Sequence, residues 1–333
     1  MKVLEGVTVI DFTQTYGGSF CTMQLADFGA KVIKVDFSSS TGIEILKKMT
    51  ETAEVIVESF AQETMQKWGL DYESVKKYNP KVIYASLSSF GQTGPMKDMH
   101  VDDSTIQAMS GLMDMTGFPE SSPVKAGVSV SESLAGLNTA LGICMAYYHK
   151  LRTGEGQRVD VAAFDSLFGI MESPILFESM LNISLTRSGN NDAATLVPYD
   201  TYECKDGYFS VGLASESGWG KFTETIEMPE LYNDFRFENN EKRCKNFEEL
   251  DPILRSYFIK KTKDELGALF SAAGIPNSPV LSVSEIMVHE QLKDREMIVS
   301  FEDCEMGATK RLGNPMKMDI TPPTYEKNSA SRS

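Results

Sequence analysis

One carboxylate stands in an otherwise small and apolar stretch, KAGVSVSESLAGLNTALG, at residues 125–142. This residue is Glu132, and with Ser131 as the expected N-cap it falls in the first turn of a predicted helix. The helix dipole and the free N–H groups there favour a negative charge by about 0.3–1 kcal/mol. A carboxylate so placed either stabilises the helix start and does nothing more, or acts as a nucleophile that forms a covalent intermediate.

Other nucleophiles and bases are few. The chain has three histidines: His149 falls in an apolar helical stretch and His289 on a charged one, which favours structural roles, whereas His100 falls in a loop after a predicted strand. There is no GxSxG motif and no convincing pairing of Ser or Cys with His, so covalent catalysis by Ser or Cys is not expected. Asp165, in VDVAAFDSLF, is a further candidate for a direct role, but it could equally cap a helix or form a structural ion pair.

The composition limits the possible partners and compartments. The 333 residues include 47 Asp and Glu against 32 Lys and Arg, a net charge of −15, so neither nucleic acid nor an anionic membrane is an expected partner. The five cysteines are scattered without a CxxC pair, which favours reduced thiols over disulfides or zinc, and no metal site is expected. No signal peptide or membrane span is recognisable, so we expect a soluble, cytoplasmic protein.

The first ninety residues alternate between short β-branched runs and amphipathic segments. This order indicates βαβ units and a parallel sheet, hence a doubly wound, Rossmann-like α/β domain. The predicted strands cover residues 7–12, 31–37, 54–60 and 81–88, and the predicted helices between them cover residues 19–29, 41–53 and 63–69.

Ligands of such a sheet bind beyond the carboxyl ends of the strands. Here those ends are TQTYGG (13–18), SFA (59–61) and SFGQTGP (89–95). The first of them opens a helix, and Asp36 follows about twenty residues on, but the third glycine of GxGxxG is missing, so an NAD site is not favoured. A Gly-Gly turn before a helix still offers backbone N–H groups to an anionic or carbonyl group.

The rest of the chain predicts a buried helix and then a second domain. Residues 131–151 are apolar nearly all round, and their Ala and Gly residues would let a neighbouring backbone approach closely. Residues 153–173 predict a turn, a strand and another buried helix. From about residue 186 the pattern changes, and KDG separates two alternating stretches as in a hairpin. We therefore predict a large domain at 1–185, to which 300–333 returns, and a smaller α+β domain at 186–299. Within the returning part, the Pro-containing segment at 313–323 is expected to be irregular.

Several longer motifs, in this order and spacing, resemble the family III CoA-transferases, which include the formyl-CoA, carnitine and bile-acid CoA-transferases. No single motif is decisive, but the resemblance runs over nearly the whole chain. The motifs are LEGVTVIDFTQTYGGSFCTMQLADFGAKVIKV, AEVIVESF, YNPKVIYASLSSFGQTGP, TGEGQRVDVA, YDTYECKDGYFSVGL, AGIPNSPVLSVSEI and GNPMKM.

The resemblance implies transfer of coenzyme A (CoA) from an acyl-CoA to a small free carboxylic acid through covalent enzyme intermediates. CoA and acyl-CoA are then substrates, with no permanently bound cofactor. The family nucleophile is an aspartate in a G-D-x-x-x-G pattern at the start of a buried helix, and S-E-S-L-A-G places Glu132 there. Family members are interlocked homodimers, so a homodimer is expected.

The same resemblance assigns CoA contacts and points to two alternatives. The expected contacts are Tyr16, Gly17, Ser59, Phe60, Ala61, Lys67, Met99, His100, Val101, Asp102 and Asp103. A segment of a few dozen residues that follows VIKV in the family, and that carries basic nucleotide-binding positions, is missing here. This loss and the altered nucleophile leave open a non-catalytic partner subunit. An α-methylacyl-CoA racemase is less favoured, because Asp102 stands where its histidine would fall.

Overall fold

The computed structural model describes residues 2–35, 42–191, 195–213, 215–303 and 307–325. Its contacts divide the chain into two compact units, the first comprising Met1–Met113, Lys125–Leu185 and Glu290–Ser333, and the second Asp114–Val124 and Thr186–His289. The predicted division differs at residues 114–124 and 290–299. The first difference has a local cause, since Arg187 donates to the carbonyl of Asp114 at 2.8 Å and the N–H of Gly189 donates to that of Gly117 at 2.9 Å.

A five-stranded parallel sheet forms the first unit, which confirms the predicted doubly wound α/β fold. The strand order is β2-β1-β3-β4-β5, so the chain starts near the middle of the sheet and builds outward in both directions. In register, Val9 of β1 faces Val32 of β2 and Val55 of β3. The strands are β1 (Thr8–Asp11), β2 (Lys31–Lys34), β3 (Val55–Glu58), β4 (Ile83–Ser88) and β5 (Arg158–Ala162).

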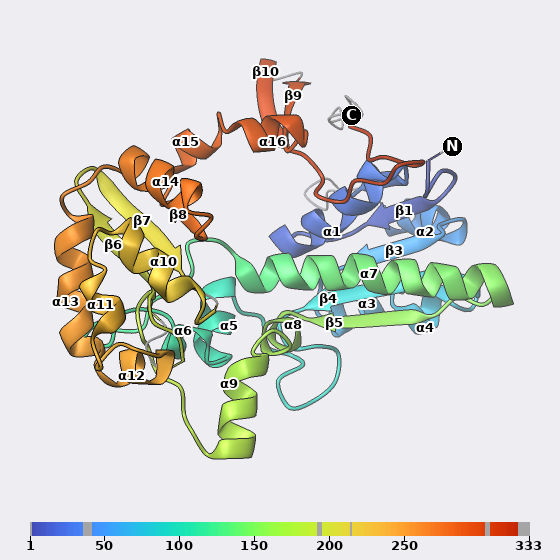
Figure 1. Cartoon of the computed structure of the whole chain (residues 1–333). Helices are drawn as coiled ribbons and strands as arrows, with labels where there is room; N and C mark the ends of the chain where they lie inside the picture. The colour runs from blue at the N-terminus through green and yellow to red at the C-terminus, as the bar shows by residue number, and fades with distance from the viewer. Residues whose placement is uncertain (1, 36–41, 192–194, 214, 304–306, 326–333) are drawn as a thin grey trace. The chain divides into compact units, whose positions relative to one another are not determined.

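Helices cover both faces of this sheet because successive strand residues point to opposite sides. Val9 packs in one apolar cluster with α1 and α7, while its neighbour Ile10 packs in another with α2, α3 and α4. Figure 1 shows α7 running along one face. The helices of this unit are α1 (Tyr16–Asp27), α2 (Ile43–Glu51), α3 (Gln62–Trp68), α4 (Tyr72–Val75), α5 (Asp103–Met109), α7 (Val130–Thr153), α8 (Ala163–Phe168), α9 (Glu172–Leu176), the π-helix η1 (Phe177–Leu181) and α16 (Glu290–Asp294), with α6 (Leu112–Met115) at the unit boundary.

The helix α7 approaches α1 so closely that only glycine fits at the contact. A Cβ atom on Gly136 would lie 2.5 Å from the carbonyl oxygen of Gly17, and one on Gly17 would lie 2.7 Å from that of Glu132. Both distances are shorter than any real Cβ contact, and the obstructing atoms belong to backbone. The small residues of α7 therefore serve the close backbone approach that their sequence predicts.

The prediction that α7 is buried all round is wrong. One face is buried, but the apolar side chains of the other face are between 42% and 69% exposed in the single chain, and they recur at helical spacing. Composition indicates how apolar a helix is, whereas coverage depends on which elements pack against it. The exposed face consists of Leu137, Leu141, Met145, Tyr148 and Leu151.

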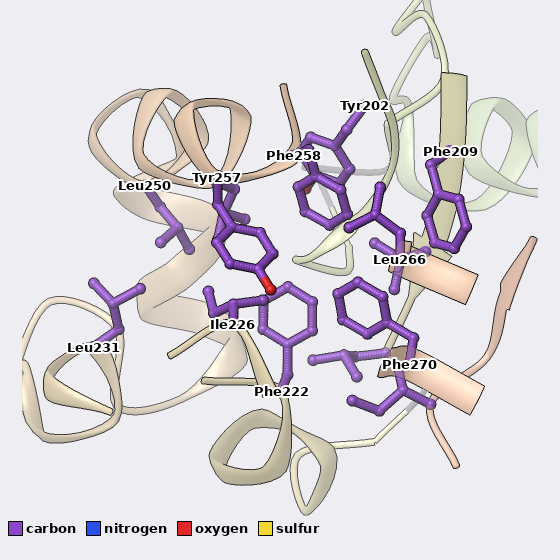
Figure 2. Packing of buried hydrophobic residues seen from close by; sticks show 14 of the residues in the cluster. Tyr202, Phe209, Phe222, Ile226, Leu231, Leu250, Tyr257, Phe258, Leu266 and Phe270 are labelled. Atoms are coloured by element: carbon purple, nitrogen blue, oxygen red, sulfur yellow. The ribbon is translucent and has the colours of Figure 1, made fainter. Parts of the chain in front are cut away.

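The second unit has its own sheet and its own apolar core. Strands β6 and β7 form the predicted hairpin, with Cys204 opposite Gly207, and β8 adds to β7 in antiparallel orientation. Figure 2 shows the aromatic packing beside this sheet, in which Phe258 stacks on Tyr202 at 4.3 Å and on Phe270 at 5.7 Å between ring centroids. The elements are β6 (Tyr199–Cys204), β7 (Gly207–Gly212), α10 (Gly218–Thr225), α11 (Glu230–Asn233), α12 (Asn240–Lys245), α13 (Phe247–Phe258), α14 (Lys263–Ala272), β8 (Asn277–Pro279) and α15 (Val283–Ile286).

The C-terminal part of the first unit consists of a pair of strands followed by the predicted irregular segment. Strands β9 (Ile298–Asp303) and β10 (Gly307–Leu312) pair in antiparallel orientation. Residues 313–323, which the sequence analysis expects to be irregular, form neither a helix nor a strand. The chain then docks on α1, because the buried Asn314 donates to Gln24 at 2.7 Å and to Asp27 at 3.2 Å. Of the helices in the described ranges, none combines the length and the apolar character that crossing a membrane requires.

The contact between α1 and α7 predicts the effect of one methyl group. Gly136→Ala should lower the free energy of unfolding by about 1–3 kcal/mol, because the Cβ must displace the backbone of α1. Denaturant titration measures this value. As a matched control, Gly267→Ala in α14 adds a Cβ with no atom within 4 Å and should be neutral or stabilising by up to about 1 kcal/mol. Equal effects of the two changes would contradict the close approach.

Candidate active site

A cavity of about 100 Å³ lies at the carboxyl ends of the central strands of the first unit. It joins the turn after β1, the loop after β3, the end of β4 and the start of α7. These segments include all three crevice segments of the sequence analysis, in part, together with Glu132. The lining residues are Thr15, Ser59, Leu87, Ser88, Ser89, His100, Val101, Asp103, Ile106, Ser131, Glu132 and Ala163.

The side chain of Glu132 lies between two helix starts. Glu132 itself sits in the first turn of α7, and its Oε2 accepts a hydrogen bond of 2.9 Å from the backbone N–H of Gly17 in the first turn of α1. Each helix N-terminus carries a partial positive charge. The Gly-Gly turn thus presents an N–H group to an anionic group, as its sequence predicts, and that group is the carboxylate of Glu132.

Asp103 holds the N-terminus of α7 from another element. Its Oδ1 accepts from the N–H of Ser131 at 2.8 Å, from the hydroxyl of Ser131 at 2.6 Å and from the N–H of Glu132 at 3.4 Å. The expectation that Ser131 is the N-cap is wrong, because α7 begins at Val130 after Ser129. A carboxylate of α5 performs the capping function instead, and it thereby fixes the direction of Glu132.

An ion pair between a buried aspartate and an exposed lysine holds the turn after β1. Asp11 is only 1% exposed, and its Oδ1 accepts from the N–H of Thr13 at 2.8 Å and from the Nζ of Lys34 at 3.1 Å. One residue further on, the N–H of Gln14 donates to the hydroxyl of Ser59 at 3.1 Å. The turn that carries Gly17 is therefore tied both to β2 and to the loop after β3.

The loop after β3 is organised by Glu58, a residue that the sequence analysis missed. Glu58 is 3% exposed, and its Oε2 accepts from the N–H of Phe60 at 2.8 Å. Burial raises the pKa of its carboxyl to about 7, although bonds from Ser86 and Phe60 and the charge of Arg158 oppose this rise. The available signal was a single acid ending the apolar strand VIVE.

Three of the five residues at 99–103 line the cavity. The N–H of Val101 donates to the hydroxyl of Ser89 at 3.1 Å, which fixes this loop to the end of β4, and His100, Val101 and Asp103 line the cavity. Asp102 instead caps α5, and the N–H of Thr105 holds the pKa of its carboxyl below the usual value. Met99 is 47% exposed and does not line the cavity.

Other predicted contact residues lie outside the cavity lining. Tyr16 is half exposed and stacks on Phe20, Phe60 packs edge-on against Trp68, and Ala61 is the N-cap of α3. Lys67 is largely exposed and lies 3.9 Å from Glu63.

The alternative candidates from the sequence are also placed. Asp165 lines a separate cavity of about 330 Å³ beside the loop at 90–96, His149 is exposed on α7, and Asp36 lies outside the described residues. Within the described ranges, no group of three or more His, Cys, Asp and Glu side chains could hold a metal ion. Cys21, Cys144 and Cys204 are free thiols, and Cys304 is not among the residues that the structure describes.

Comparison with known proteins gives a consistent set of relatives. The model of CoA-transferase family III matches residues 4–37 and 35–329. The two matched ranges meet at 35–37, which is where the sequence analysis places the missing segment.

Individual relatives match over nearly their full length. The acetyl-CoA:oxalate CoA-transferase of Acetobacter aceti is 30% identical, with 98% of this chain and 92% of the relative covered. The succinyl-CoA:mesaconate CoA-transferase of Haloarcula hispanica is also 30% identical, with 97% and 92% covered. Among solved structures, a CAIB/BAIF family protein from Brucella suis has a TM-score of 0.89 and 28% identity, with 99% of this chain and 96% of that chain covered.

The raised pKa of Glu58 predicts a pH-dependent stability. The folded state binds the proton more tightly than the unfolded state, so the contribution of Glu58 is fully present below about pH 4.5 and is lost as the pH rises to about 7. Glu58→Gln cannot ionise, so its stability relative to the parent should increase by about 3 kcal/mol between pH 4 and pH 8. Urea unfolding at both pH values measures this difference, and a value near zero would contradict the burial of an ionisable Glu58.

Proposed function

This chain belongs to CoA-transferase family III, and we propose that Glu132 is the carboxylate that accepts the acyl group in its reaction. The enzyme transfers coenzyme A from an acyl-CoA to a carboxylic acid. The observation that carries the proposal is the hydrogen bond of 2.9 Å between Glu132 Oε2 and the N–H of Gly17, at a cavity formed by the strand ends. The alignment of motifs supports it, because Glu132 takes the place of the family nucleophile.

The proposed reaction has four balanced steps. The Glu132 carboxylate attacks the thioester carbonyl, which forms a mixed anhydride and releases the CoA thiolate. The thiolate attacks the side-chain carbonyl of Glu132, which forms a glutamyl thioester and releases the donor acid. The acceptor carboxylate then attacks this thioester, which gives a second anhydride and frees the thiolate again. Attack of the thiolate on the acceptor acyl group yields the new acyl-CoA and restores the Glu132 carboxylate.

In this scheme the Gly17 N–H stabilises the charge that develops on Glu132. When the thiolate attacks the side-chain carbonyl, one oxygen of Glu132 becomes an oxyanion, and an N–H donor about 3 Å away stabilises it. The first turns of α1 and α7 add partial positive charge at the same place. Asp103 acts indirectly: it accepts hydrogen bonds from the N–H groups of Ser131 and Glu132 and so holds the backbone that carries Glu132.

We propose that acyl-CoA is bound around this cavity. Ser59, His100, Val101 and Asp103 are favoured as contacts by their position in the cavity lining, and the backbone of Gly17 by its bond to Glu132. The contacts that rest on the family resemblance alone are Tyr16, Phe60, Ala61, Lys67, Met99 and Asp102.

We propose that the substrates are an acyl-CoA and a small carboxylic acid, as the names of the relatives suggest. We also propose that CoA binds only as part of a substrate or product and that the enzyme has no permanently bound cofactor. The named relatives use succinyl-CoA with mesaconate and acetyl-CoA with oxalate. We propose a cytoplasmic location because the free thiols of Cys21, Cys144 and Cys204 suit a reducing compartment.

We further propose a homodimer. The support is the exposed apolar face of α7, whose five side chains would be costly to leave in water. A second copy of the chain could cover this face, and family membership favours the same assembly.

Hydroxylamine trapping tests the role of Glu132. After incubation with an acyl-CoA and hydroxylamine, mass spectrometry of peptides should find a hydroxamate on Glu132, because both the anhydride and the thioester react with this amine. Glu132→Gln should lower turnover by at least about 1000-fold. The matched control is Glu155→Gln in the exposed turn after α7, which should leave turnover unchanged. Full turnover by Glu132→Ala would rule out the proposed nucleophile.

Sedimentation tests the dimer. The full chain should sediment as a dimer. Leu141→Glu should raise the dissociation constant of the dimer about tenfold or more, because it places a charge on an apolar face that the dimer would bury. The control Tyr232→Glu changes a similarly exposed side chain of α11 and should leave the dimer intact. If the dissociation constant of the dimer is the same in both variants, the interface does not include this face of α7.

A further inference from the structure

Glu58 combines deep burial with a direct hold on the loop after β3. It is the last residue of β3 and 3% exposed, and its Oε2 accepts from the N–H of Phe60, two residues ahead, at 2.8 Å. This bond closes a tight turn whose middle residue is Ser59. The carboxylate of Glu58 therefore determines the path of the backbone at Ser59.

The turn at Glu58 is linked to the catalytic cavity by two further contacts. Ser59 lines the cavity together with Glu132, and the Ser59 hydroxyl accepts from the N–H of Gln14 at 3.1 Å. Gln14 belongs to the turn that presents the Gly17 N–H to Glu132. A change at Glu58 can thus reach the cavity through these hydrogen bonds and the short backbone segments between them.

The charges around Glu58 are mostly negative. It lines a separate cavity of about 110 Å³, to which β4 contributes Tyr84 and Ser86 and the α4 region contributes Asp71 and Glu73. From β5, Arg158 attracts its charge and Asp160 repels it. One guanidinium faces several carboxylates, so the ionised form of Glu58 depends on the bonds from Ser86 and Phe60.

We propose that Glu58 is a positioning residue for acyl-CoA: its ionised carboxylate holds the 59–61 loop at the catalytic cavity, and protonation weakens this hold. The inference rests on the proposed function of that cavity. A charged acceptor binds an N–H group about twice as strongly as a neutral one. Because burial raises the pKa of Glu58 to about 7, the change takes place at near-neutral pH.

Calorimetric titration of the full-length enzyme with CoA, at pH 6 and at pH 8, tests this proposal. For the parent enzyme the dissociation constant should be about three- to tenfold larger at pH 6. Glu58→Gln keeps an acceptor for Phe60 but cannot ionise, so it should bind at both pH values as the parent does at pH 6. Glu73→Gln removes a charge from the same small cavity without a bond to Phe60, and it should retain the pH dependence of the parent.

Steady-state kinetics separates positioning from folding. Glu58→Ala should raise the KM for acyl-CoA about tenfold with kcat within about twofold, whereas loss of folded enzyme would lower kcat and leave KM unchanged. If Glu58→Gln, unlike Glu58→Ala, has the KM of the parent enzyme at pH 6, the result supports the role of residue 58 as a hydrogen-bond acceptor. A parent-like pH profile in Glu58→Gln would overturn the proposal. The proposed function would fail in a different way: no hydroxamate would form on Glu132, although CoA binding would still depend on pH.

Discussion

The contact between the backbones of α1 and α7 is the constraint on which the site depends. Gly17 and Gly136 let the two helices approach without any intervening Cβ, and this approach brings the Gly17 N–H to within 2.9 Å of the Glu132 carboxylate. The same contact closes one face of the parallel sheet, because α1 and α7 share an apolar cluster with β1, β3 and β4. The same two glycines therefore affect both the core packing and the position of Glu132.

Around this contact, acidic side chains do most of the positioning. Asp11 holds the turn after β1, Asp103 holds the start of α7, and Glu58 holds the loop after β3, each by accepting backbone N–H groups. The cavity lining itself contains no Lys or Arg.

Sequence reasoning was most successful where local patterns determine structure. The β-branched runs and the KDG turn predict the strands and the hairpin, and the rule for parallel sheets predicts the three strand-end segments that contribute Thr15, Ser59 and Ser89 to the cavity. It was less successful where burial or distant contacts decide. Asp103 caps a helix that starts 27 residues later, and the pKa of Glu58 depends on which side chains cover it. The exposed face of α7 could not be predicted, since apolar content does not specify which elements pack against a helix.

The docking of Asn314 on α1 has a consequence for synthesis of the chain. Gln24 and Asn314 are hydrogen-bonded partners separated by 290 positions, and the second unit lies between them in the sequence. At a translation rate of about 5–20 residues per second, α1 waits roughly 15–60 s for this partner to be made. The second unit consists of the continuous stretch 186–289 and the short earlier segment 114–124. During that interval it can form its aromatic core on the ribosome. The domain that begins the chain is thus the last to be completed.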